Sequence, residues 1–334
     1  NIPFSLTRLH TCPIESPQFE DDLRWFKGVC AVVNGLKGAR IAMIGARPIA
    51  FNTVRYSEKL LQKHGISVQT IDFSEIIFKA MHYNDAEKVV AKIKEIREYG
   101  SVPAWISDEV MEKQAKLCLV IDEAIEDLQC DASTVQCWDS VENNYGCATC
   151  LAMSMMGDNG KPSACESDVT GALSMLAAWL AAGTAPALMD WNNNIREERN
   201  ACVSLHCSNF PKSFFQNDVE IECLDVLGST LGKENCFGAC KGHVAAGDMT
   251  FIRLTTDDQR GTVKAYLGEG VFRDEVIPTK GGVANCYIEN LQNLLRYVCE
   301  NGYEHHVCFV RGHVADILEE ALTKYMGIPV YRHR

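Results

Sequence analysis

The sequence predicts an α/β protein in which a Rossmann-like, doubly wound parallel sheet is followed by a β-rich, antiparallel, barrel-like part. Over residues 36–195, apolar strand patterns alternate with amphipathic helix patterns, which is typical of parallel βαβ units. Over residues 196–334 the pattern changes to short alternating runs between glycine-rich turns, which indicates an antiparallel sheet or small barrel. Residues 1–35 are expected to form an N-terminal linker and helix.

The individual elements follow from apolar periodicity and from turn residues. Strands are expected at 39–45, 66–72, 132–138 and 186–190, all in the parallel sheet. The helices between them are expected at 52–63, 74–81, 85–98, 108–127 and 166–182. The C-terminal part is expected to contain strands at 203–206, 220–224, 248–254, 261–267 and 307–310, with helices near 287–301 and 313–326.

Length, charge and hydropathy restrict the class of protein. A chain of 334 residues exceeds the usual size of a single hydrophobic core and favours two domains. The net charge of -12 argues against nucleic acid or an anionic membrane as a partner. No apolar run approaches the roughly 18 residues of a membrane span, and no secretory signal opens the sequence. These features favour a cytoplasmic protein that binds small molecules or other protein chains.

The 16 cysteines are scattered through apolar segments, which indicates buried reduced thiols rather than a disulfide framework. The single CxxC, Cys147 to Cys150, lacks a second CxxC and a thioredoxin-like context, so zinc binding or redox chemistry is the less favoured interpretation. The loop Gly45-Ala-Arg-Pro48 lacks both the G-x-G-x-x-G and the P-loop lysine patterns, which disfavours nucleotide binding.

Two carboxylates mark the candidate site. If residues 166–182 form a helix between parallel strands, Glu166 at its start and Asp190 at the end of the next strand lie at the same edge of the sheet. Such a pair can bind a divalent cation, act as general acid and base, or cap the elements. An acid in the first helical turn is also favourable by itself, by about 0.3 to 1 kcal/mol. The pattern alone leaves these alternatives open.

Other residues are candidates for completing this site. Imidazole ligands could come from His206, His243, His305, His306 or His313, and a site of two carboxylates with one or two imidazoles suits Mn²⁺ or a similar cation. The sheet-edge argument also places Arg47 and Gln136 nearby. For Gln136, backbone capping is an equal alternative. For Arg47, an ion pair with a local acid such as Glu58 is the favoured alternative.

Four blocks of sequence provide a further signal: Ala164-Cys-Glu-Ser-Asp-Val-Thr-Gly-Ala-Leu173, Leu188-Met-Asp-Trp-Asn-Asn193, His206-Cys-Ser-Asn209 and His305-His-Val-Cys-Phe-Val-Arg-Gly-His-Val314. Together these blocks resemble the L-fucose/L-arabinose isomerase family. The resemblance implies a Mn²⁺-dependent aldose-ketose isomerase of carbohydrate metabolism, assembled as a homo-oligomer that is hexameric or trimer-based. It also implies an α/β fold with a C-terminal β-rich domain.

The resemblance further implies the roles of particular residues. Glu166 and Asp190 match the catalytic carboxylates that also bind the metal, and His306 matches a C-terminal metal ligand. His206 resembles an additional ligand of the arabinose branch, whereas Asp at position 190 favours the fucose branch. Gln136, Arg47 and Asn193 are candidates for binding the hydroxyl groups of a monosaccharide. The family's first α/β domain is expected to be missing, because Asn1 aligns near the entry to the second.

The implied chemistry moves a carbonyl from C1 to C2 of an open-chain sugar through an ene-diol. A metal that chelates O1 and O2 stabilises the ene-diolate, and a carboxylate on each side can exchange the proton. The alternative is a non-catalytic sugar-binding or regulatory module derived from such an isomerase, which the missing domain favours.

Overall fold

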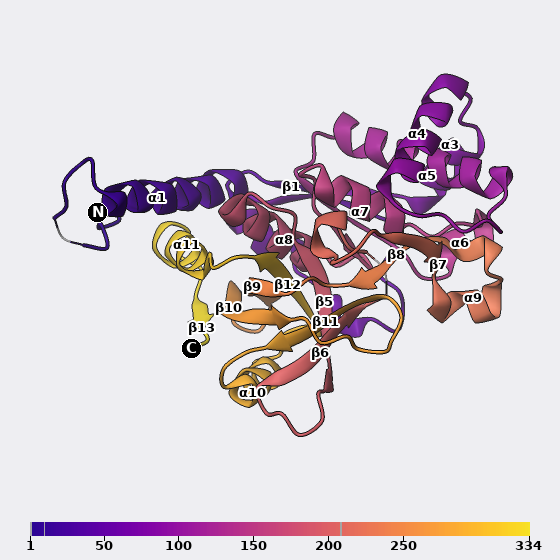
Figure 1. The fold of residues 1–334 in the computed structure, drawn as a ribbon. Helices are drawn as coiled ribbons and strands as arrows, with labels where there is room; N and C mark the ends of the chain where they lie inside the picture. Colours follow the sequence, from indigo (N-terminus) through magenta and orange to yellow (C-terminus); the bar gives the residue numbers. More distant parts are fainter. Residues whose placement is uncertain (1, 10, 208) are drawn as a thin grey trace.

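The computed structural model describes residues 2–9, 11–207 and 209–334, so Asn1, and Ser208 of the third sequence block, lie outside the described residues. Two sheets organise the chain (Figure 1). A parallel sheet has the order β2-β1-β3-β4, and a larger, mainly antiparallel sheet closes on itself. The expected α/β fold with a barrel-like C-terminal part is therefore confirmed. The boundaries of the domains expected at 1–35, 36–195 and 196–334 stay a prediction.

The parallel sheet and its helices come from the first half of the chain. Its strands are β1 (Arg40–Ile44), β2 (Ser67–Ile71), β3 (Ala132–Val135) and β4 (Ser163–Cys165). The helices are α1 (Pro17–Leu36), α2 (Glu58–Lys63), α3 (Phe73–Met81), α4 (Ala86–Tyr99), α5 (Asp108–Asp127), α6 (Ser140–Asn144), α7 (Cys150–Asp158) and α8 (Val169–Ala182). The order of strands reverses at β1, so the crevice beyond the ends of β1 and β3 is the topological switch point.

Six strands close the barrel, because β10 pairs with both β9 and β11. They are β5 (Ala187–Asn194), β6 (Ala201–His206), β9 (Gly247–Asp257), β10 (Thr262–Arg273), β11 (Gly282–Tyr287) and β12 (His306–Arg311). Three strands extend this sheet: β7 (Glu220–Cys223), β8 (Phe237–His243) and β13 (Val330–Arg332). The associated helices are α9 (Asp225–Leu231), α10 (Leu291–Glu300) and α11 (Ala315–Glu320), the last followed by a π-helical turn at Ala321–Tyr325.

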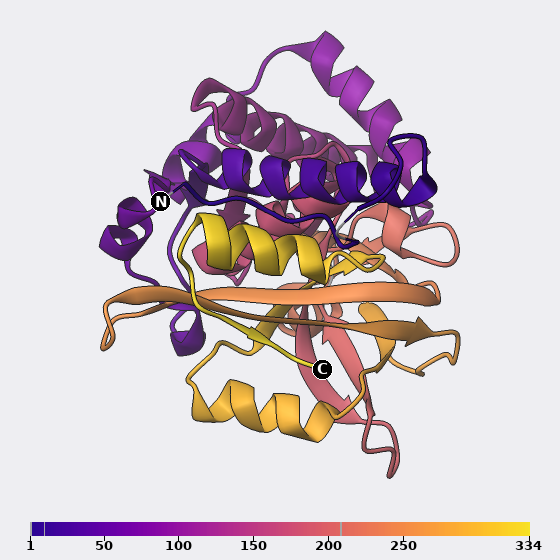
Figure 2. The same cartoon turned by 90° about the vertical axis from the view of Figure 1, so that its left-hand side faces the viewer.

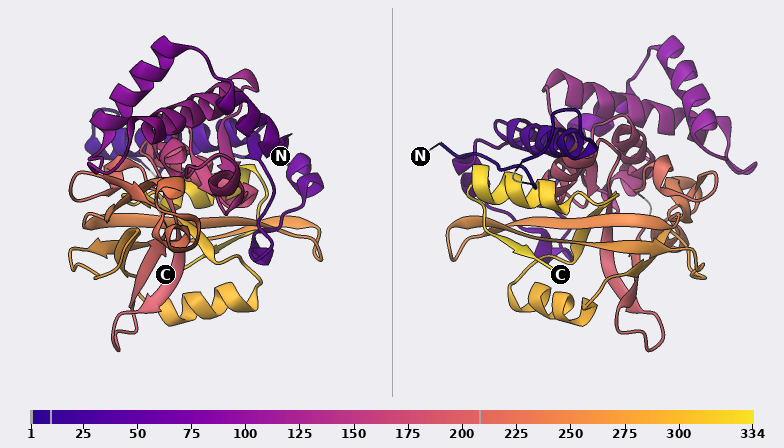
Figure 3. Two further views of the ribbon diagram at one scale, coloured as in Figure 1. Left: turned by 90° about the vertical axis from the view of Figure 1, so that its right-hand side faces the viewer. Right: turned by 60° about the vertical axis from the view of Figure 1, so that its left-hand side comes forward.

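The views from the side show how helices cover the barrel. In Figure 2, α1 and α11 lie in layers over one side of the long strands β9 and β10, while α10 lies on the other side. Figure 3 shows the group α3, α4 and α5 at the opposite end of the molecule from α10. No helix in the described part of the chain is long and apolar enough to cross a membrane.

Helix α8 lies between the two sheets. Its small and apolar side chains are buried continuously from Val169 to Ala178, because α8 contacts β3 and β4 of the parallel sheet and β9 and β12 of the barrel. A charged side chain on this part of the helix would be buried away from solvent. The uniformly apolar composition of the helix is therefore a consequence of packing on all sides.

Two expectations about this region are wrong. The strand at 186–190 does not join the parallel sheet, because β5 pairs antiparallel with β6 and β12 in the barrel. The helix does not begin at Glu166 but at Val169, because the Asp168 side chain accepts a hydrogen bond from the Gly171 amide and caps the helix. The predicted helix at 52–63 is also divided, into a 3₁₀ turn at Asn52–Val54 and α2.

Candidate metal centre

Barrel pairing positions three of the candidate residues. His306 of β12 is directly opposite Asp190 of β5, and Asp190 is in turn opposite Leu205, the neighbour of His206 in β6. Directly opposed residues of antiparallel strands project to the same face with their Cβ atoms about 4.5 to 5.5 Å apart. Strand register in the barrel therefore brings Asp190 to His306. The sequence had instead predicted Asp190 at the edge of the parallel sheet.

Glu166 reaches the same place from the other sheet. It follows β4 directly, in a short turn before α8, and it is buried. Glu166 and Ser167 have φ angles of 64° and 56°, a left-handed conformation that is uncommon for residues other than glycine. Such a conformation persists only where the surrounding structure stabilises it, and residues in this conformation are found disproportionately at functional sites.

Both carboxylates approach the imidazole of His306. The Nε2 atom of His306 lies 3.3 Å from Glu166 Oε2 and 3.7 Å from Asp190 Oδ1. One possible cluster of metal ligands consists of Glu166, His206 and His306, with potential ligand atoms within 4.8 Å of one another. A second consists of Asp190, His305 and His306. The two clusters share His306, so each of the predicted ligands Glu166, Asp190, His306 and His206 belongs to at least one cluster, but neither cluster contains both carboxylates.

The polar atoms at this point suit a divalent cation. Glu166 Oε2, Asp190 Oδ1 and His306 Nε2 are buried and have no hydrogen-bond partner among the residues that the structure describes. Leaving such atoms unpaired is costly, whereas a cation bound at either cluster would satisfy His306 Nε2 and the carboxylate oxygen of that cluster. Two carboxylates and one or two imidazoles match the preferences of Mn²⁺ and related metals. The residues present therefore fit the implied metal.

A buried network fixes the orientation of His306. Its Nδ1 atom lies 2.7 Å from Asp168 Oδ2, which leaves Nε2 directed at the carboxylates. Arg253 donates to both oxygens of Asp168, and its Nε atom donates to Glu304 at 3.1 Å. A carboxylate that accepts a hydrogen bond from the outer nitrogen of a histidine is the usual support of a metal-binding imidazole.

The charges in this network depend on one another. Burial disfavours the charged form of Asp168, but Arg253 and His306 outweigh it and hold its pKa well below the usual range. Burial likewise opposes protonation of His306, but the hydrogen bond with Asp168 and the nearby Glu166 carboxylate raise its pKa to about 10. Sequence analysis missed Asp168, Arg253 and Glu304 as parts of the site. The only available signal was the aspartate before Val169, which indicates a helix cap and nothing more.

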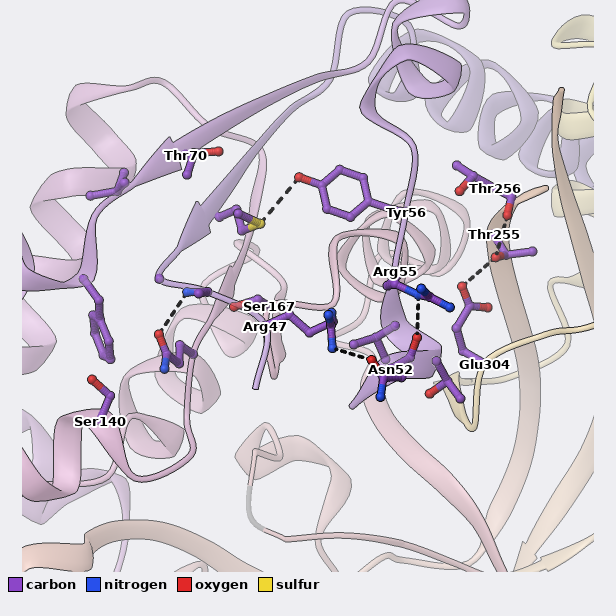
Figure 4. Close-up of a pocket in the computed structure, with 18 of the residues that line it drawn as sticks. Arg47, Asn52, Arg55, Tyr56, Thr70, Ser140, Ser167, Thr255, Thr256 and Glu304 are labelled. Atoms are coloured by element: carbon purple, nitrogen blue, oxygen red, sulfur yellow. Dashed lines mark hydrogen bonds between the residues drawn. The ribbon is translucent and has the colours of Figure 1, made fainter. Parts of the chain in front are cut away.

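The cavity beside this centre contains two of the three predicted sugar-binding residues. Gln136 and Arg47 line a cavity of about 1990 Å³ at the switch point. Figure 4 labels Arg47 among the residues of this lining. The Gln136 carboxamide oxygen accepts a hydrogen bond from the Ala46 amide at 2.9 Å, which is the capping contact considered above. Arg47 donates to Pro48 and Asn52, and no ion pair with Glu58 occurs within the described ranges. Asn193 is exposed near the end of β5 and does not line this cavity, so its sugar-binding role stays a prediction.

The remaining candidates lie elsewhere. His313 is half exposed and approaches Asp248 at 3.8 Å, and His243 ends β8, so neither belongs to the two clusters. Cys147 and Cys150 are buried free thiols and are also outside both clusters. His305 does adjoin the centre: its Nε2 lies 3.7 Å from Asp190 Oδ1, and its Nδ1 lies 2.6 Å from the Thr53 hydroxyl.

Fold and site together define an α/β protein with a candidate carboxylate-histidine metal centre between a parallel sheet and a closed barrel. Residues 204–334 match the family model described as "L-fucose isomerase, C-terminal domain". This match and the relatives that follow confirm the resemblance to the L-fucose isomerase family.

Curated relatives extend the similarity to most of the chain. A protein named sulfoquinovose isomerase from Priestia aryabhattai is 27% identical over 297 residues, which cover 87% of this chain and 64% of the relative. One of the same name from Alkalicoccus urumqiensis is 25% identical over 307 residues, covering 90% of this chain and 66% of the relative. The chain therefore spans slightly less than two thirds of the length of these relatives.

Proposed function

We propose that the protein is a Mn²⁺-dependent aldose-ketose isomerase that acts on an open-chain sugar, with Glu166 and Asp190 as its catalytic carboxylates. The observation that carries this proposal is the convergence of Glu166 Oε2 and Asp190 Oδ1 on His306 Nε2, all three without hydrogen-bond partners in the described residues. The names of the curated relatives agree with an isomerase reaction on a sugar.

The residues of the site can perform the proton transfers that this reaction needs. One carboxylate accepts the proton from C2 and a proton returns to C1, while the O2 hydroxyl proton passes to O1, so that the carbonyl moves from C1 to C2. A bound divalent metal would act as a Lewis acid on the carbonyl and the adjacent hydroxyl. Glu166, His306 and Asp190 would hold it, with His206 as a further ligand. Asp168 keeps the Nδ1 proton of His306 in place.

The substrate is proposed from the relatives and the cavity. Their name denotes a sulfo-substituted sugar, so sulfoquinovose is the first aldose to test. Gln136 and Arg47 line the cavity next to the centre and are proposed to bind the substrate. The assembly of a homo-oligomer and a cytoplasmic location stay predictions.

Metal binding by the purified chain tests this proposal first. Titration with Mn²⁺, followed by electron paramagnetic resonance, is expected to show one tight site that Glu166→Gln weakens strongly. Glu220→Gln, an exposed substitution in β7, serves as the matched control and is expected to bind like the wild type. A wild-type chain without a tight site, or tight binding that survives Glu166→Gln, would contradict the proposal. Tight binding without turnover would instead favour the sugar-binding module.

A further inference from the structure

The cavity beside the metal centre has walls from both halves of the chain. It is lined by residues that follow β1, β2 and β3, and by the β9-β10 turn and residues 300–304. Its volume of about 1990 Å³ exceeds the roughly 300 to 1,000 Å³ of a typical small-molecule site. The space is therefore sufficient for a sugar that carries an additional substituent.

Two arginines of the cavity lining, Arg47 and Arg55, both contact Asn52. Arg47 Nη1 donates to the Asn52 side chain at 3.3 Å, and Arg55 Nε donates to the Asn52 carbonyl at 3.0 Å (Figure 4). Neither arginine forms an ion pair with a carboxylate in the described part of the chain, although the chain carries 44 acidic residues. Each guanidinium keeps further N–H donors, and guanidinium groups match the geometry of tetrahedral oxyanions.

The acidic residues of the same cavity do not cancel this charge. Asp72 caps α3, Asp257 pairs with Lys264, and Glu304 pairs with Arg253. The other acidic residues of the lining are exposed, as Arg55 is, and none of them forms an ion pair with Arg47 or Arg55 within the described residues: Glu75, Asp258 and Glu300. The two arginines are thus cationic groups available to a ligand.

The segment that carries the arginines is tied to the metal centre. Thr53, between Asn52 and Arg55, contacts His305 Nδ1 at 2.6 Å, and the Phe51 ring stacks on the His305 ring with centroids 6.0 Å apart. Ser167 follows Glu166, lines the same cavity, and is almost completely buried. The Ser167 hydroxyl has no hydrogen-bond partner among the described residues, which favours a polar ligand beside it.

We propose that Arg47 and Arg55 form an anion subsite that binds the sulfonate or phosphate group of a sugar whose carbonyl end lies at Glu166, Asp190 and His306. This inference rests on the proposed function for the position of the carbonyl end. It assigns the preference for an acidic sugar to two residues of the segment between β1 and α2. Bidentate hydrogen bonds from guanidinium groups to sulfonate or phosphate oxygens would provide that preference.

Calorimetric binding to the full chain with Mn²⁺ present tests the subsite. Sulfoquinovose is expected to bind about tenfold or more tightly than quinovose, which lacks the sulfo group. The double variant Arg47→Gln, Arg55→Gln is expected to remove this difference. Arg296→Gln, which changes an exposed arginine on α10, is expected to preserve it. Replacement of both arginines by lysine keeps the charge and is expected to restore part of the difference.

The possible outcomes separate the subsite from the proposed function. Equal binding of the two sugars, or a difference that survives the double glutamine variant, overturns the subsite. Tighter binding of glucose 6-phosphate than of sulfoquinovose, lost in the double variant, supports the subsite and assigns it to phosphate. Arginine-dependent binding without any Mn²⁺-dependent isomerisation supports the subsite and contradicts the proposed function.

Discussion

His306 and Asp190 are directly opposed residues of the antiparallel strands β12 and β5, and His306 Nε2 lies 3.7 Å from Asp190 Oδ1. Glu166 comes to the same imidazole from a turn beside the parallel sheet, at 3.3 Å. The centre therefore depends on how the barrel packs against the α/β part, and α8 between the two sheets sets that packing.

Removing the carboxylate behind His306 is expected to weaken metal binding. Asp168→Asn keeps a helix cap but replaces the hydrogen-bonded carboxylate at His306 Nδ1, so the affinity for Mn²⁺ should fall by about 10- to 100-fold. Isothermal titration with Mn²⁺ measures the change. Asp85→Asn alters the equivalent cap of α4 and is the matched control. Equal losses in both variants would show that Asp168 acts only as a helix cap.

Arg253 is expected to be essential for stability. Its guanidinium is fully buried between Asp168 and Glu304, so Arg253→Met leaves two buried carboxylates without their cation. The free energy of unfolding should decrease by about 3 to 5 kcal/mol. Urea denaturation compares this variant with Arg260→Met, which breaks a largely exposed ion pair and should cost about 1 kcal/mol or less. If the free energy of unfolding decreases by a similarly small amount in both variants, the buried network does not contribute the expected stability.

Glu142 of α6 is expected to lower the free energy of unfolding as the pH rises toward 8. Its side chain is 2% exposed, neither carboxylate oxygen has a hydrogen-bond partner within the described residues, and burial raises its pKa to about 8. Between the unfolded pKa of about 4.3 and this value, the native state binds more protons than the unfolded state. Stability therefore decreases as the pH rises through this window, by up to about 1.4 kcal/mol per pH unit.

Glu142→Gln removes this titration. Its stability relative to the wild type should increase between pH 5 and pH 8, as measured by urea unfolding at the two values. Glu87→Gln, at an exposed position in α4, should show no such trend. A difference between Glu142→Gln and the wild type that is the same at both pH values would mean that Glu142 does not titrate in this range.

The sequence predicted individual elements better than their pairing. Periodicity located α3, α4 and α5 to within one residue at each end, because each combines a long amphipathic pattern with an N-cap. It could not show that β5 belongs to the barrel, since a short apolar run is compatible with either sheet. The three-residue strand β4 was missed because it has too few residues for a pattern.

The sequence predicted that Glu166 and Asp190 lie at one site, but it attributed this to a shared edge of the parallel sheet. The structure gives a different reason. Glu166 and Asp190 do approach a common imidazole, but through strand register in the barrel and a left-handed turn after β4. The supporting residues Asp168, Arg253 and Glu304 could not be predicted, because their importance comes from burial and mutual contact between segments distant in sequence. Such contacts leave no periodic signal in a single sequence.

Sugar isomerisation under metal control is the decisive experiment for the proposed function. Sulfoquinovose is incubated with the chain after complete removal of metal, and with the same sample after one equivalent of Mn²⁺ is restored, while NMR follows the aldose and ketose signals. The account predicts ketose formation only with Mn²⁺, and its loss in Glu166→Gln. Equal conversion without metal, or no conversion of sulfoquinovose or other aldoses by the chain with Mn²⁺ bound, would contradict it.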